Sequence, residues 1–86
     1  MIDERYTSFF NWLIATKSLS DNSASDVVSR IKRAKTIMDI DVPIDIETLL
    51  FHFTGKPAFK ILTTSVKSQL KRAIKLYKQF DSGVNI

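Results

Sequence analysis

The side chains best suited to catalysis or metal binding are few in this chain. His52 is the only histidine, and cysteine is absent from the 86 residues. Zinc sites need three or four nitrogen, sulfur or oxygen ligands, and a nucleophilic side chain needs a neighbouring base. The two glycines, Gly55 and Gly83, exclude a Gly-rich phosphate loop. We therefore expect no enzyme active site, no metal and no cofactor.

A short acidic segment loosely suggests a loop that binds a cation. It contains Asp39, Asp41, Asp45 and Glu47. The spacing lacks the glycine at the sixth position and the glutamate at the twelfth that an EF-hand loop uses. Helix capping and solvation explain these acids more economically.

A row of lysines is the strongest functional signal. Lys67, Lys71, Lys75 and Lys78 recur at the spacing of one helix face. Like charges spaced in this way destabilise an isolated helix by about 0.2–0.5 kcal/mol per pair, a cost that a bound polyanion would offset. Lysine and arginine bind phosphates and release counterions, so the row favours a nucleic-acid ligand. A face that only keeps the chain soluble is the alternative.

The charge is distributed in blocks along the chain. The net charge of +4 comes from 13 basic and 9 acidic residues. Residues 30–35 and 56–86 are strongly basic, whereas residues 1–29 and 36–55 are net acidic. The positive charge therefore gathers in two segments, which favours an anionic partner.

The candidate nucleic-acid-binding residues lie in these two segments and just before them. They are Asn22, Ser25, Ser29, Arg30, Lys32 and Arg33 in the first region, and Lys67, Ser68, Lys71, Arg72, Lys75 and Lys78 in the second. Arginine can read guanine, and asparagine or glutamine can read adenine, so Gln69 is a further candidate for base contacts. The aromatic residues, Phe51 among them, fall at core spacing, and we expect no platform for base stacking.

Four amphipathic segments must position these residues. Apolar periodicity predicts helices over about residues 3–16, 21–38, 46–53 and 64–81. Ser20, Asp45 and either Thr63 or Thr64 are suited to cap the last three of them. The β-branched stretch 40–46 has room for a short strand, but Pro43 favours a loop. We predict an all-α, compact bundle of four helices that forms one domain over residues 1–86.

Several short motifs resemble a known family. They are Phe9-Phe10-x-Trp12-Leu13, the segment from Lys17 to Ala24, Val27-Val28-x-Arg30-Ile31-Lys32-Arg33, and the later run from Thr64 to Phe80. Together they resemble the SAM-like core-binding domain of phage integrases and other tyrosine recombinases. Lys17-Ser18 stands where that family usually has a glycine, and Ser23 stands where it has a threonine.

The resemblance implies a SAM-like fold whose second and fourth helices face DNA as one half of a clamp. The catalytic arginine, histidine and tyrosine residues of the family belong to a separate C-terminal domain, for which this chain has no room. We therefore expect a non-catalytic, cytoplasmic module of a phage or mobile element that binds double-stranded DNA.

Other partners fit the same charges. A small interaction module could meet an acidic protein with its basic face, and a SAM-like bundle could self-associate. The longest uncharged run, residues 6–16, is too short to span a bilayer, so we expect no membrane partner. We also expect no small-molecule substrate.

Overall fold

The computed structural model describes residues 4–83 of the chain, and regular structure within them is helical throughout. The helices are α1 (Glu4–Lys17), α2 (Asp21–Ile37), α3 (Ile46–Thr54), α4 (Pro57–Lys60) and α5 (Thr64–Ser82). Within residues 4–83 there is no strand, and residues 40–45 form a loop. The predicted all-α class is confirmed.

Side-chain caps explain where α2, α3 and α5 begin. The Oγ of Ser20 accepts a hydrogen bond from the Ser23 amide at 3.2 Å, and the Asp45 carboxylate accepts one from the Thr48 amide at 2.9 Å. Thr63, rather than Thr64, caps α5. Each observed bound in the described part lies within one residue of its prediction, while the predicted first residue, Asp3, lies outside the described residues.

The single-turn helix α4 is not predicted from the sequence. Pro57 follows the end of α3 and begins α4 at its first position. Proline suits that position because the missing N–H would have no partner there in any case. The turn brings Phe59 into the core, where its ring centroid lies 5.2 Å from that of Phe53.

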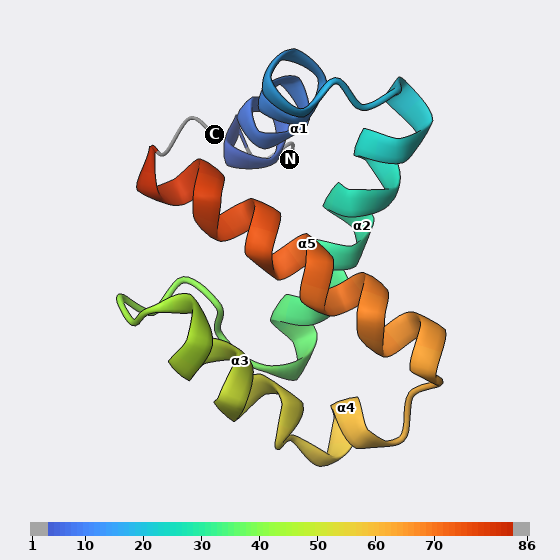
Figure 1. Cartoon of the computed structure of the whole chain (residues 1–86), viewed down its shortest axis with the longest axis vertical. Helices are drawn as coiled ribbons and strands as arrows, with labels where there is room; N and C mark the ends of the chain where they lie inside the picture. Colours follow the sequence, from blue (N-terminus) through green and yellow to red (C-terminus); the bar gives the residue numbers. More distant parts are fainter. Residues whose placement is uncertain (1–3, 84–86) are drawn as a thin grey trace.

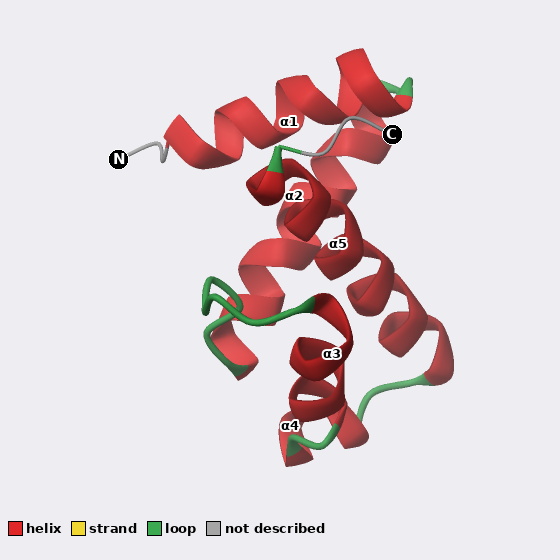
Figure 2. Ribbon diagram, turned by 60° about the vertical axis from the view of Figure 1, so that its left-hand side comes forward, coloured by secondary structure: helices red, strands yellow, loops and turns green. Residues whose placement is uncertain are grey.

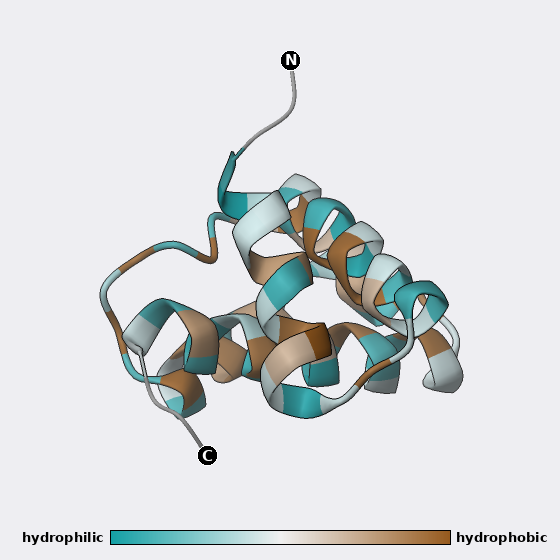
Figure 3. Ribbon diagram, turned by 90° about the horizontal axis from the view of Figure 1, so that it is seen from above, coloured by the Kyte–Doolittle hydropathy of each residue, from teal (hydrophilic) through white to brown (hydrophobic). Residues whose placement is uncertain are grey.

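The helices are arranged around a central pair. α2 and α5 pack against each other in the middle of the molecule, α1 crosses them at one end, and α3 and α4 lie at the other (Figures 1 and 2). Hydrophobic and hydrophilic residues alternate along the helices (Figure 3), as helices with one buried face require.

One cluster of buried apolar residues joins all of these elements. Its members are Phe9, Leu13, Ala24, Val27, Ile31, Ala34, Ile40, Leu49, Phe53, Phe59, Leu70, Ala73, Ile74 and Tyr77. Phe51 does not belong to it and is 76% exposed, so its predicted core position is wrong. At 3.6 residues per turn, Phe51 must point away when its neighbours Leu49 and Phe53 both point inward.

Candidate nucleic-acid interface

The predicted residues of α2 lie mostly on its solvent-facing side. Exposed residues are Asn22, Ser25, Ser29, Lys32 and Arg33, while Arg30 is half-buried. The two edges of this side meet different helices. Lys32 places its Nζ 5.2 Å from the ring centroid of Tyr6 on α1, whereas Arg30 and Arg33 lie toward α5.

A small groove brings the two arginines together with α5. Arg30, Arg33 and Ser29 line it from α2, and Gln69 lines it from α5, around a volume of about 230 Å³. Asp26 also lines this groove, which places one carboxylate beside the two guanidinium groups. The groove therefore presents both hydrogen-bond donors and hydrogen-bond acceptors to a ligand.

The lysine row of α5 lies on the edge of the helix that faces α3 and α4. Lys67 places its Nζ 5.7 Å from the ring centroid of Phe59 on α4. Lys78 donates a hydrogen bond of 3.0 Å to the carbonyl oxygen of Val42 in the loop before α3. The row is therefore separated from the arginines of α2 by the width of α5.

The outer surface of α5 connects the two sets. Ser68, Gln69 and Arg72 are exposed there. Arg72 lies one turn from both Ser68 and Gln69, and Lys75 lies one turn from Arg72, so these side chains are neighbours on the helix surface. The predicted residues thus form a broad strip across α5 and the near edge of α2, with Lys32 apart on the far edge.

Within residues 4–83 the cations of this strip form no ion pairs. The ion pairs there are those of Arg5 with Asp41 and Asp81 and of Lys35 with Asp41. The basic residues predicted to bind nucleic acid take no part in them. Lys78 is engaged by the Val42 carbonyl, and Asp26 lies beside Arg30 and Arg33. The cations that can meet an external anion are Lys67, Lys71, Arg72 and Lys75.

A polar cluster that was not predicted joins both ends of the chain to the loop before α3. The Tyr77 hydroxyl donates a hydrogen bond of 2.7 Å to Asp41, and Lys35 lies 3.1 Å from the other oxygen of the same carboxylate. Arg5 donates to the Tyr77 hydroxyl and pairs with Asp81. Capping and solvation were expected to account for Asp41, and its place at the centre of this cluster was not foreseen.

The cluster shifts the pKa values of its members. Burial opposes ionisation of Asp41, but hydrogen bonds from Tyr77 and Lys35 outweigh it and hold the pKa of Asp41 below its ordinary value. Burial likewise disfavours the charge of Lys35, yet its contacts with Asp41 and Tyr77 raise the pKa of Lys35. Burial and the bond to Asp41 raise the pKa of Tyr77. A buried tyrosine usually finds a partner for its hydroxyl, which is the one sequence signal that pointed to such a cluster.

Two further candidates of the sequence lie on α3 or at its start, and Asp45 shares a groove with Lys75 and Lys78. His52 is exposed on α3, with its ring centroid 5.6 Å from that of Phe51. Asp45 caps α3. Residues 4–83 hold no group of three or more acidic, histidine or cysteine side chains that could share a metal ion. No helix of the described part is both long and apolar enough to cross a membrane.

Comparison with protein-family models, with curated proteins and with solved structures finds no match.

Proposed function

We propose that this chain binds double-stranded DNA without cleaving it, through a basic face formed by α2 and α5. This face comprises Asn22, Ser25, Ser29, Arg30, Arg33, Lys67, Ser68, Lys71, Arg72, Lys75 and Lys78. The observation that carries the proposal is that none of its cations forms an ion pair within residues 4–83, where the ion pairs are those of Arg5 and Lys35. Lys32, on the far edge of α2, would contribute only through its general positive field.

The two parts of the face suit two kinds of contact. Flexible lysines on α5 can reach phosphates, which supplies affinity that does not depend on base sequence. The groove between the helices presents Arg30, Arg33 and Gln69 together, and these are residue types that read guanine and adenine edges. We assign phosphate binding to the lysines and base contacts to the groove.

The resemblance to the core-binding domain of tyrosine recombinases supports the same two helices. Ser18 has a φ of +56°, in the left-handed region that favours glycine. It stands where that family usually has its glycine, so the local backbone agrees with the resemblance. We therefore propose a SAM-like bundle whose second and last helices face the duplex.

Binding of a labelled duplex across a salt series tests the proposal. With six to eight phosphates contacted, the logarithm of the association constant should fall with the logarithm of salt concentration at a slope of about −5 to −7. Lys71→Glu should weaken binding and lower the magnitude of this slope by about 1 or more. Lys56→Glu, the same charge change at an exposed lysine outside the face, is the matched control.

Two results would contradict the proposal. One is absence of duplex binding at low salt, and the other is equal weakening by Lys71→Glu and Lys56→Glu, which would show a response to net charge alone. Salt-sensitive binding to an acidic protein in place of DNA would favour the interaction module.

A further inference from the structure

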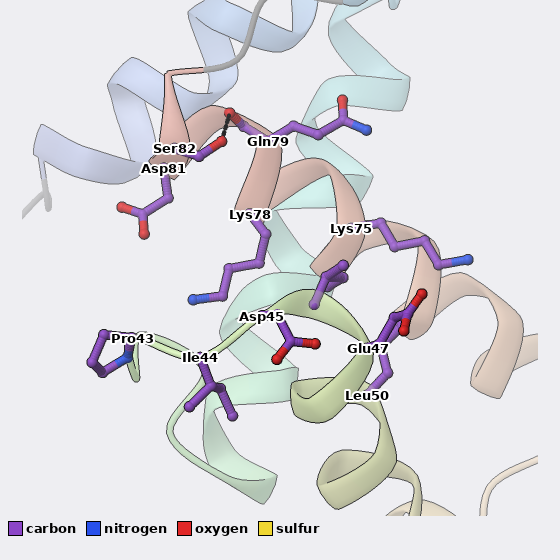
Figure 4. Close-up of a pocket in the computed structure, with 11 residues that line it drawn as sticks. Pro43, Ile44, Asp45, Glu47, Leu50, Lys75, Lys78, Gln79, Asp81 and Ser82 are labelled. Carbon is purple, nitrogen blue, oxygen red and sulfur yellow. Dashed lines mark hydrogen bonds between the residues drawn. The ribbon is translucent and has the colours of Figure 1, made fainter.

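A second and larger groove lies on the other side of α5 from the arginines. It has a volume of about 730 Å³ and runs between the loop with Pro43 and Ile44, the first half of α3 and the last two turns of α5. Lys78 points from α5 toward the loop, whereas Gln79 points away from it (Figure 4). The groove therefore has one wall from the loop and α3 and one from α5.

The centre of this groove is apolar and open to solvent. Ile44, Ile46 and Leu50 line it, and Ile44 is 37% exposed. Apolar side chains left in contact with water favour a partner that covers them. A ligand for this groove must therefore bring an apolar group.

The same surface carries such a group beside the groove. Phe51 directly follows Leu50 on α3 and lies one turn after Glu47, which lines the groove. Its side chain is the most exposed aromatic of the described residues, at 76%. One patch thus holds both an apolar cavity and a protruding aromatic ring.

The charges at the rim are also complementary to one another. Glu47 stands on the α3 wall and Lys75 on the α5 wall, and neither forms an ion pair within residues 4–83. The other charged groups at the rim are engaged, since Asp45 caps α3, Asp81 pairs with Arg5 and Lys78 bonds Val42. One free anion and one free cation therefore face each other across the groove.

We infer that the occupant of this groove is a second copy of the chain, related by a two-fold axis. Such an interface uses the same patch on both subunits, so that patch must complement itself. A two-fold axis through the groove lets Phe51 of each copy enter the groove of the other, with Glu47 of each facing Lys75 of the other. This inference goes beyond DNA binding and does not depend on it.

Sedimentation equilibrium or light scattering without DNA tests the dimer. We expect the mass to rise from one chain toward two with concentration, and Phe51→Ser to raise the dimer dissociation constant about 30-fold or more. Because Phe51 is exposed, this variant should keep its fold, which circular dichroism can verify. Ile61→Ser, a change at a residue that is 84% exposed and does not line the groove, is the matched control and should leave the mass unchanged.

A charge exchange adds an independent test of the pairing. Glu47→Lys and Lys75→Glu should each weaken the dimer, because like charges then meet across the interface. The double variant should restore it. Lys75 also belongs to the proposed basic face, but the measured mass in the absence of DNA reports only on self-association.

Three outcomes would overturn the inference. A mass of one chain up to the millimolar range, where even weak specific complexes form, would leave the groove to a different partner. A dimer that is unaffected by Phe51→Ser would place the interface elsewhere. Equal weakening by Phe51→Ser and Ile61→Ser would show non-specific association.

Discussion

Among single residues, Tyr77 connects the core of the molecule to its most distant segments. Its ring packs edge-on against Phe9 at 5.2 Å between centroids, while its hydroxyl donates to Asp41 and accepts from Lys35. The hydrogen bonds give a buried polar atom the partners that it would otherwise obtain from water. The loop before α3 is thereby tied to α2 and α5 through one side chain.

The stability of the fold should depend on pH through this cluster. The pKa of Asp41 is lowered by folding, so its contribution is present above the unfolded pKa of about 3.9 and is lost as pH falls below it. The pKa values of Lys35 and Tyr77 are raised, so their contributions are present below about pH 10 and are lost above it. Unfolding by urea at a series of pH values measures the loss of stability at acid pH and at alkaline pH.

Asp41→Asn tests the contribution of the Asp41 carboxylate to the loss of stability at acid pH. The difference in unfolding free energy between the parent chain and Asp41→Asn should be largest near neutral pH and should shrink toward about pH 3. Asp26→Asn, at an exposed acid without an ion pair in residues 4–83, is the control and should show little difference. A pH-independent difference for Asp41→Asn would contradict the assigned role of its charge.

Phe51 and Asp41 were misplaced from the sequence for two different physical reasons. Phe51 and Phe53 have the same side chain and lie two positions apart, yet one is exposed and the other is buried. Phe51 was expected at core spacing together with Phe53, but residues two positions apart on a helix lie about 200° apart around its axis, so both cannot point inward. Asp41 was misjudged because its partners, Tyr77 and Lys35, lie 36 and 6 residues away, and no local pattern records such a contact.

Helix ends were predictable because their signals are local. Ser20, Asp45 and Thr63 cap their helices with their own side chains, and Gly83 ends α5 with a φ of +73°. The sequence pattern did not predict α4, because a single turn is too short to show a helical periodicity. Its existence depends instead on the burial of Phe59 against Phe53.

The backbone is strained at the junction between α1 and α2, which predicts that a glycine there stabilises the protein. Ser18 ends α1 with a φ of +56°, a conformation that costs a residue with a Cβ about 1–2 kcal/mol. Ser18→Gly removes that strain but adds freedom to the unfolded chain, which costs roughly 0.5–1 kcal/mol. We expect a net stabilisation of about 0.5–1 kcal/mol in urea unfolding.

The same serine-to-glycine change inside a helix should destabilise the protein. Ser68 is exposed in the second turn of α5, where Ser68→Gly should destabilise the protein by about 0.5 kcal/mol. Destabilisation by both variants would mean that Ser18 makes a contact worth more than its backbone strain.

Across the whole molecule, the buried cluster is shared between the two ends. Leu49 and Phe53 on α3 belong to the same cluster as Phe9 and Leu13 on α1, with α2 and α5 between them. A chain of 86 residues has a total stability of only about 5–15 kcal/mol. We therefore expect that neither end persists once the other is lost.

Leu49→Ala tests whether the two ends unfold together. Leu49 is fully buried, so its truncation should cost about 2–5 kcal/mol. Trp12 is the only tryptophan and lies at the opposite end, with its ring centroid 5.8 Å from that of Phe80. The urea midpoint followed by Trp12 fluorescence should fall by the same amount as the midpoint followed by helical circular dichroism. A two-state transition has the same midpoint with every probe.

Ile61→Ala, at a residue that is 84% exposed, is the control. It should change the unfolding free energy by no more than about 0.5 kcal/mol with either probe. If Leu49→Ala instead shifted the circular dichroism and left the Trp12 midpoint in place, α3 and α4 would unfold on their own, and the cluster would not act as one core.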